Sequence, residues 1–349
     1  MTQLDLFAGL EEEPEPVPAT FAATQTPAVS SSPPPATVPS PRPPRPRVVR
    51  DPHGQAMRIG EAVAGVWHRQ HGGTRIEVPI GIVAALALIR QRDEDGPDLK
   101  AQILGQDDAQ LIGMFREIWS MYWIHRPDLI DRARILHEWL NDEEIDGHRA
   151  YVVRGVTKAA LDYGLFDLTA HADPYLRAQA DVLSPVMMLV RSSGAQQGLG
   201  EYHTPAPVAD AMADLLAAES VFDVTLQANE PQRGQHIHDP AGGSGGLLRS
   251  AAQHLRERGQ DPADFQWSMC DIDEIAAACG AVNAIIWSLG PRVTVACDDS
   301  LANPRAIEDA MKHARAVIEH RDETLGKARI IAAVRQAQQL LEQATPVAA

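Results

Sequence analysis

The chain has 349 residues, 44% of them hydrophobic, which is enough for a sizeable core and suggests two domains with a tail. Its net charge of −16 excludes a protein that grips nucleic acid through a generally basic surface. It has no run of about 18 uncharged apolar residues and no signal-peptide pattern, so we expect a cytoplasmic protein without a membrane span. The cysteines at 270, 279 and 297 lack metal-type spacing, and we expect no metal site.

Residues 1–57 are the first predicted segment, and their composition differs from the rest. Residues 1–52 hold half of the chain's 26 prolines, with Ser, Thr and Ala between them, which is typical of a disordered and partly polyproline tail. The basic end of this tail, residues 41–50, is either a solvated linker or an arm that contacts phosphate groups.

A short motif, QLDLF, stands at the start of this tail; its residues are Gln3, Leu4, Asp5, Leu6 and Phe7. It resembles the pentapeptide by which many bacterial proteins dock on the replication sliding clamp. Apolar anchors on a flexible tail can enter a surface groove while the body stays free to move. The motif therefore predicts the sliding clamp as a partner, and a chance match is the alternative.

Residues 58–181 are predicted to form a helical domain, because apolar residues recur there at steps of three and four. The periodic stretches are residues 60–70, 79–92, 108–144 and 153–168. The tryptophans of this segment fall at the same spacing, and we expect them in the core.

Residues 182–304 are predicted to form an α/β core, and residues 305–349 a further helix and tail. A helix at 206–219 is followed by strands and helices in alternation, which is the signature of a parallel sheet with crossover helices. The predicted strands are 236–240, 265–273 and 292–300, and the predicted helices are 246–259, 274–290 and 305–341.

Three features follow the three predicted strands, at the edge where parallel sheets bind ligands. The first strand leads into DPAGGSGG, Asp239–Gly246, whose glycines permit a sharp turn before a helix with free N–H groups. Asp271 and Asp273 follow the second strand, where an acid can accept both hydroxyls of a ribose. Asp298 and Asp299 follow the third, where a carboxylate can accept from an adenine amino group. Taken alone, the glycine-rich segment could be a phosphate-binding loop, and each acid could be a solvated side chain at the end of a strand. Together and in this order, the three features predict a nucleoside-binding site.

Other reactive side chains near this site fit its chemistry less well. His203, His236 and His238 could suggest a metal, but no carboxylate or cysteine spacing completes a ligand set. Ser244 lies between glycines like a nucleophile, yet the sequence places no base beside it.

The segment GLGEYHTPAPVADAMADLL, residues 198–216, precedes these features. GEYHTP, DPAGGSGG, CDID and DDSL together resemble the motifs of the methyltransferase subunit of type I restriction–modification systems, which belong to the adenine-specific N6 DNA methylases. The resemblance covers residues 58–301 and is most specific in the first two motifs. It implies a Rossmann-like methyltransferase core and S-adenosylmethionine as cofactor. Its implied partners are restriction–modification subunits and DNA, the DNA being held through a partner subunit.

The same resemblance implies a set of cofactor-binding residues. They are Tyr202, Thr204 and Pro205 at the methionine end; Asp239, Ala241, Gly243 and Gly245 in the loop; Asp271 at the ribose; and Asp299 at the adenine. The chain departs from the family pattern at Gly242, where the family usually has cysteine or alanine.

The family's catalytic tetrapeptide, Asn or Asp followed by Pro-Pro and an aromatic residue, holds and stacks the target base. It does not occur here: NPR at 303–305 lacks the second proline and the aromatic, and SPPP at 32–35 lies in the tail. The sequence therefore assigns no catalytic residue. It leaves open an adenine-specific DNA methyltransferase, a non-catalytic cofactor-binding or scaffold subunit that pairs with another methylase, and a fragment of a split methylase.

A core of only three strands would be truncated relative to that family and would leave its first strand at an edge. A bare hydrophobic edge favours aggregation. We therefore expect the 305–341 helix or another subunit to cover it.

Overall fold

The computed structural model describes residues 48–70, 73–91, 98–142, 145–191, 204, 206–217 and 232–344. The QLDLF motif, Tyr202, His203 and Pro205 lie outside these described residues. Within the described part of the chain, no helix is long and apolar enough to cross a membrane.

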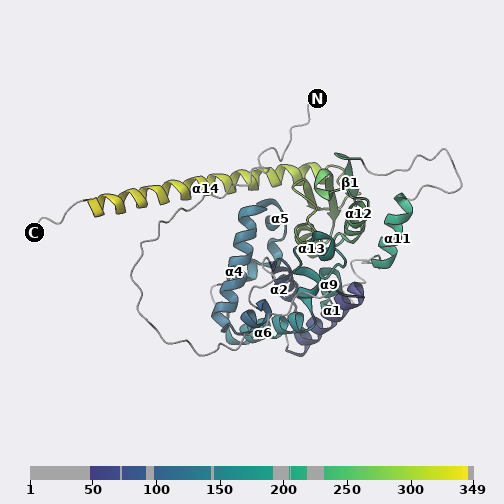
Figure 1. Cartoon of the computed structure of the whole chain (residues 1–349), viewed down its shortest axis with the longest axis horizontal. Helices are drawn as coiled ribbons and strands as arrows, with labels where there is room; N and C mark the ends of the chain where they lie inside the picture. The colour runs from purple at the N-terminus through teal and green to yellow at the C-terminus, as the bar shows by residue number, and fades with distance from the viewer. Residues whose placement is uncertain are drawn as a thin grey trace, which may run out of the picture.

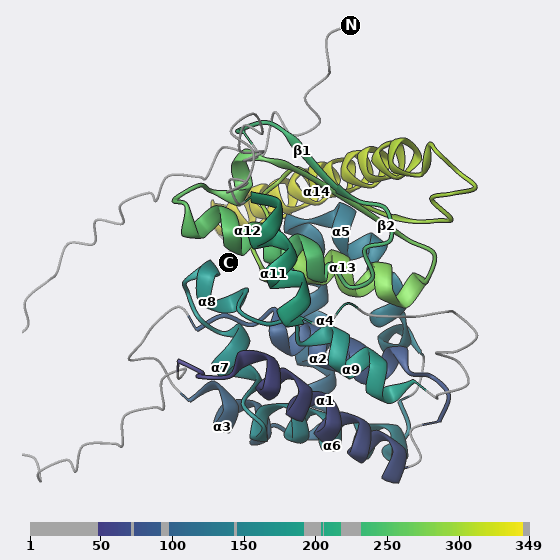
Figure 2. The same ribbon diagram turned by 90° about the vertical axis from the view of Figure 1, so that its right-hand side faces the viewer.

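A layer of helices, most of them in the lower part of the molecule in Figures 1 and 2, forms as the apolar periodicity predicts, and its α5 reaches the level of the sheet. Its elements are α1 (Pro52–Arg69), α2 (Glu77–Ala87), α3 (Leu99–Leu104), α4 (Asp108–His125), α5 (Pro127–Arg132), the short 3-10 helices η1 (Arg134–Leu136) and η2 (Glu138–Asn141), α6 (Gly147–Asp162), α7 (Leu165–Thr169), α8 (Pro174–Arg177) and α9 (Leu183–Val190). The nearly uncharged helix α2 is buried on all sides, and the others pack around it.

Two local signals divide the longer periodic stretches into separate helices. Pro127 has no N–H to continue α4 and instead begins α5. Gly164 has φ of 84°, a left-handed conformation that separates α6 from α7. Helix starts follow the expected chemistry, since Asp107 accepts from the Gln110 N–H at 2.8 Å and the Gln110 side chain accepts from the Asp107 N–H.

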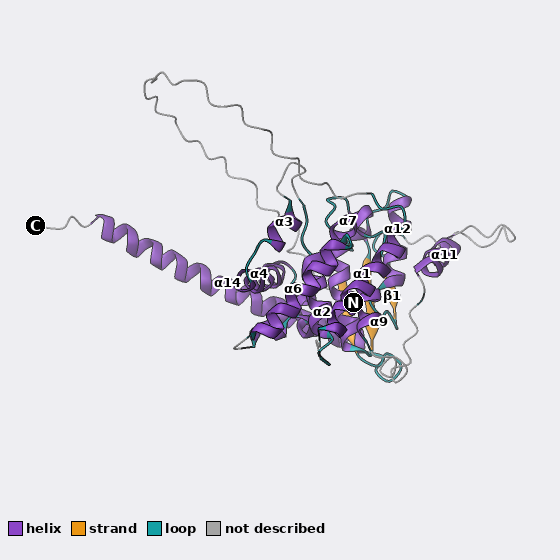
Figure 3. Cartoon of the chain, turned by 90° about the horizontal axis from the view of Figure 1, so that it is seen from below, coloured by secondary structure: helices purple, strands orange, loops and turns teal. Residues whose placement is uncertain are grey.

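The upper layer is a parallel sheet with strand order β1-β2-β3, and it confirms the predicted α/β fold class. The strands are β1 (His236–Asp239), β2 (Gln266–Asp271) and β3 (Val293–Cys297), and the helices with them are α11 (Ala206–Ala217), α12 (Gly246–Glu257), η3 (Pro262–Asp264), α13 (Glu274–Ile286) and α14 (Ala306–Ala344). The strands, orange in Figure 3, are few beside the helices.

Different elements pack against the two faces of the sheet. Trp267, Met269 and Val295 belong to the main core cluster, which also includes α13 and the helical layer. The opposite face carries Cys270 and Ala296, which pack against the first turn of α14. The predicted helical and α/β parts therefore share one hydrophobic core.

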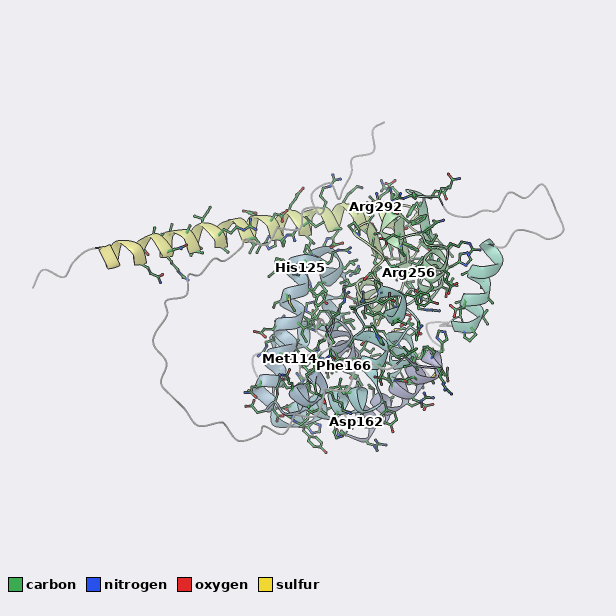
Figure 4. All side chains as sticks on the ribbon, viewed as in Figure 1. Met114, His125, Asp162, Phe166, Arg256 and Arg292 are labelled. Atoms are coloured by element: carbon green, nitrogen blue, oxygen red, sulfur yellow. The ribbon has the colours of Figure 1, made fainter. Side chains whose placement is uncertain are left out.

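Helix α14 packs against β3, β2 and α5, and then extends well past the body (Figures 1 and 3). His125, at the end of α4, lies beneath it in Figure 4. β1 is an edge strand of the described sheet, as expected. The expectation that the 305–341 helix covers that edge is wrong, because the apolar positions of its first turns fit the Cys270 face and β3 instead. Coverage by another subunit stays a prediction.

Candidate functional site

The strand-end acids and the glycine loop meet at the carboxyl edge of the sheet. Asp239 ends β1 and pairs in register with Met269, while Asp271 ends β2 and pairs with Cys297. The loop after β1 bends over the end of β2, where the Gly243 N–H donates to Asp271 Oδ2 at 2.7 Å. The structure therefore brings Asp239, the loop and Asp271 together, as the sequence predicts.

The loop depends on glycine at particular places. Gly243 and Gly245 have φ of 54° and 91°, and Gly245 is the N-cap of α12. The Gly242 N–H donates to the Cys270 carbonyl at 2.8 Å, and a Cβ at Gly242 would come within 2.9 Å of Met269 Cβ. Glycine at position 242, in place of the family's usual cysteine or alanine, therefore fits the close approach of this loop to β2.

Asp239 is the most unusual carboxylate of the site. Its side chain is buried, and Oδ1 accepts from the Ala241 N–H at 3.1 Å. Oδ2 is buried and has no hydrogen-bond partner among the described residues. Burial, with a smaller contribution from the nearby Asp271 charge, raises the pKa of Asp239. A ligand that donates a hydrogen bond to Asp239 Oδ2 would stabilise this buried acceptor.

Asp271 at the end of β2 and Asp273 just after it have different hydrogen-bond partners. Asp271 accepts from two backbone N–H groups, Gly243 on Oδ2 and Asp273 on Oδ1, the latter at 2.9 Å. Asp273 caps α13 by accepting from the Ala276 N–H at 3.0 Å, and it forms a largely buried ion pair with Arg191 at the end of α9. Asp273 therefore anchors the helical layer to the sheet.

Asp298 and Asp299 hold the turn after β3. Asp299 Oδ1 accepts from the Leu301 N–H at 2.9 Å and the Ala302 N–H at 3.1 Å. Asp298 Oδ2 accepts from the Asn303 side-chain amide at 2.7 Å. Both acids are partly exposed at the predicted edge of the sheet, and both have a local structural role there.

The remaining predicted residues lie around this edge. Thr204 is exposed just before α11, and Ala241 is exposed in the loop. His236 and His238 are each 2.7 Å from Ser268 Oγ on β2. No group of metal-ligating side chains occurs among the residues that the structure describes.

Sequence reasoning missed a buried polar network beneath the loop. The Ser244 hydroxyl donates to Asp181 Oδ2 at 2.6 Å, and the Asn283 side-chain amide donates to Asp181 Oδ1 at 3.0 Å and to the Ser244 carbonyl at 2.9 Å. All three side chains are buried. The available sequence signal was Asp181 shortly before a helix, where its Oδ1 also accepts from the Leu183 N–H. Ser244 thus positions the loop.

The parallel strands, with the glycine loop and the acids at the strand ends, form an α/β core like that of a methyltransferase fold. Residues 186–319 match the family model described as N-6 DNA Methylase. This match spans the loop and all three strands, and over these residues it confirms the resemblance to the N6 DNA methylases that the motifs indicate.

Among solved structures, the chain is similar to the type I restriction–modification system methyltransferase subunit from Streptococcus thermophilus. The sequences are 12% identical with a TM-score of 0.35, and the match covers 71% of this chain and 60% of that one. A likeness of this size carries no argument about activity, and this chain spans less than two thirds of that subunit. None of the curated proteins matches the sequence.

Proposed function

We propose that this chain binds S-adenosylmethionine as an N6-adenine DNA methyltransferase subunit of the type found in type I restriction–modification systems. The observation that carries the proposal is the pair Asp239 and Asp271, which flank a glycine loop at the carboxyl ends of adjacent parallel strands. The N-6 DNA Methylase match of residues 186–319 supports it.

The donor and acceptor groups suit this cofactor. The buried, unpaired Oδ2 of Asp239 is an acceptor for a charged donor such as the ammonium of a methionine moiety. Each Asp271 oxygen accepts one backbone N–H, which leaves lone pairs for ribose hydroxyls. When bound, the cofactor supplies an electrophilic methyl group; the role of these residues is to hold and orient it.

The other cofactor contacts belong to the same proposal. Ala241, Gly243 and Gly245 let the loop backbone approach the ligand, and Asp299 presents its carboxylate at the adenine end. By the sequence resemblance alone, we assign Tyr202, Thr204 and Pro205 to the binding of the methionine end.

A second candidate is a non-catalytic cofactor-binding or scaffold subunit that pairs with another methylase, or one part of a split methylase. The place of β1 at the edge of the described sheet favours it, because an edge strand offers a pairing site to another chain. In either case DNA contact would come through a partner subunit, in keeping with the net charge of −16, and the site of action would be the cytoplasm.

Two assays on the purified chain separate these candidates. Equilibrium dialysis measures binding of labelled S-adenosylmethionine, and filter binding measures label incorporated into adenine-containing DNA, with and without candidate restriction–modification subunits. Binding with incorporation supports the methyltransferase; binding without incorporation supports the non-catalytic subunit. Absence of binding contradicts the methyltransferase and the cofactor-binding subunit, and supports a scaffold subunit.

A further inference from the structure

A pocket of about 190 Å³ lies beside β3, at the edge of the described sheet opposite to β1. All residues of the strand line it, together with residues of α5 and of the first three turns of α14, which lies next to α5 in Figure 1. The lining residues of this β3 pocket are all among those that the structure describes, and none of them is assigned above to S-adenosylmethionine. The β3 pocket is therefore a separate candidate site.

Arg132, at the end of α5, is the most unusual side chain of the β3 pocket. Its Nε is buried and has no hydrogen-bond partner in the described part of the chain. Two neighbouring arginines are paired instead. Arg126 donates to the two carboxylate oxygens of Asp128 at 3.1 and 2.9 Å. Arg134 pairs with Asp131. Because a guanidinium stays charged in proteins and a buried donor without a partner is costly, we expect the pocket to hold an acceptor for Arg132.

The outer edge of β3 adds backbone donors to the same pocket. The Asp298 N–H, directly after the strand, donates to the Asp271 carbonyl at 3.0 Å. Since backbone groups alternate in direction along a parallel strand, the N–H groups of Val295 and Cys297 face the other side, where the pocket lies. No further strand of the described sheet binds them. Burial raises the pKa of the Cys297 thiol and the Arg132 charge opposes this, so the guanidinium lies near the same end of β3.

The acids of the β3 pocket limit the charge of a ligand. Asp128 is paired as described above, and Asp309 pairs with Lys312 at 2.9 Å. Asp298 Oδ2 accepts from the Asn303 side-chain amide at 2.7 Å, a neutral donor that leaves the negative charge of Asp298 in place. A ligand with two negative charges, such as a phosphate, would therefore meet repulsion. A single negative charge matches the guanidinium described above.

The remaining walls of the β3 pocket are apolar. They are formed by Leu129 of α5, by Val293 and Val295 of β3, and by Ala310 and Ala314 of α14. An apolar cavity of about 150 Å³ can hold one benzene molecule, so about 190 Å³ suits a chain of roughly four to six carbon atoms with its charged end at the polar wall.

We propose that the β3 pocket binds a small organic monocarboxylate, with the Arg132 guanidinium and the edge amides of β3 on the carboxylate and the apolar walls around a short carbon chain. The bound molecule touches α5, the sheet and α14 at once, so it fastens the first turns of α14 to the body. The inference is independent of the proposed function, because its test uses no S-adenosylmethionine and no residue of that site.

Pentanoate is the probe, and pentanol is its neutral analogue of the same chain length. Isothermal titration of the full chain should show saturable binding of one pentanoate, and an affinity for pentanol lower by about tenfold or more, because the alcohol forms no charge-assisted hydrogen bond. Arg132→Gln should weaken pentanoate binding about tenfold and change pentanol binding less than about twofold. Arg58→Gln, at an exposed position of α1, is the matched control and should bind pentanoate like wild type.

Ala314→Leu is a second variant that keeps Arg132 and fills the pocket from α14. It should remove the binding of both probes while its thermal midpoint shows a folded protein. In wild type, pentanoate should slow hydrogen exchange in the first turns of α14. The proposal is overturned by absence of saturable pentanoate binding, by equal affinities for pentanoate and pentanol, or by unchanged pentanoate affinity in either variant. Tighter binding of inorganic phosphate than of pentanoate overturns the class of ligand.

Discussion

The Ser244 hydroxyl donates a hydrogen bond of 2.6 Å to the Asp181 carboxylate, across 63 positions of the chain. Ser244 belongs to the glycine loop and Asp181 precedes α9, so this contact ties the proposed cofactor loop to the helical layer. Because Asn283 donates to both partners, the loop, α9 and α13 meet at one buried carboxylate.

Ser244→Ala is expected to lower the free energy of unfolding by about 1–3 kcal/mol, because a buried charged acceptor loses a donor. Urea denaturation measures the change. Ser120→Ala, at an exposed position of α4, is the matched control and should stay within about 0.5 kcal/mol of wild type. Equal effects of the two substitutions would contradict a structural role for the Ser244 hydroxyl.

Two helical glycines offer a sharper test of the packing. A Cβ at Gly81 in α2 would lie 1.8 Å from the Leu136 carbonyl oxygen, whereas a Cβ at Gly113 in α4 meets nothing within 4 Å. Gly81→Ala should therefore destabilise the protein by about 1–3 kcal/mol or more, since backbone must shift. Gly113→Ala should stabilise it by about 0.5–1 kcal/mol through helix propensity. Thermal or urea unfolding of both variants checks the two signs, and a stabilising Gly81→Ala would refute the contact of α2 with η1.

The buried carboxyl of Asp239 gives stability a characteristic pH dependence. Its raised pKa means that the folded protein holds this proton more tightly than the unfolded chain does. The stabilisation is complete below the unfolded value of about 3.9 and is lost as pH rises through the raised folded value. Asparagine cannot ionise, so Asp239→Asn should gain stability relative to wild type as pH rises above about 3.9.

Urea titrations from about pH 2 to about pH 7 measure the difference, and Asp162→Asn provides a control of opposite sign at the acidic end of this range. Hydrogen bonds from Lys100 and Lys158 lower the pKa of Asp162, so its stabilisation is present above the unfolded value and lost as pH falls. Asp162→Asn should therefore lose stability relative to wild type as pH rises. A constant difference for Asp239→Asn would contradict its raised pKa.

The QLDLF motif stays a prediction, because it lies outside the described residues. If Leu6 and Phe7 are apolar anchors for the sliding clamp, Leu6→Ala/Phe7→Ala should abolish recovery of the clamp in a pull-down with purified proteins. Replacing Thr2 in the same tail should leave recovery intact. Equal recovery with the double variant would show that the match is accidental.

The sequence predicted those parts of the fold that local signals determine. Strand, helix and strand over residues 236–297 followed from short apolar runs between acids and glycines, and the meeting of Asp239 with Asp271 followed from parallel strand geometry. The division of 108–144 was also present in the sequence, because Pro127 cannot continue α4.

What the sequence did not reveal are the contacts between distant segments. Asp181 with Ser244, and Asp210 with Arg249, join residues far apart in the chain, and no periodic pattern encodes such pairs. The sequence left two covers open for β1, the 305–341 helix or another subunit, and the helix packs on β3 instead; where it packs depends on the shape of the assembled sheet. Whether a segment forms a helix depends mainly on its local sequence, whereas the place where that helix packs depends on tertiary structure.

The central claim is that the glycine loop, Asp239–Gly246, and the neighbouring Asp271 form part of an S-adenosylmethionine-binding site. Isothermal titration of wild type, Asp239→Ala and Asp162→Ala with S-adenosylmethionine tests it most directly. The account predicts saturable one-to-one binding to wild type and to Asp162→Ala, and a loss of at least about tenfold in affinity for Asp239→Ala, as expected when a charged hydrogen-bond partner is removed. Absence of binding to folded wild type, or equal affinity in all three proteins, would contradict the claim.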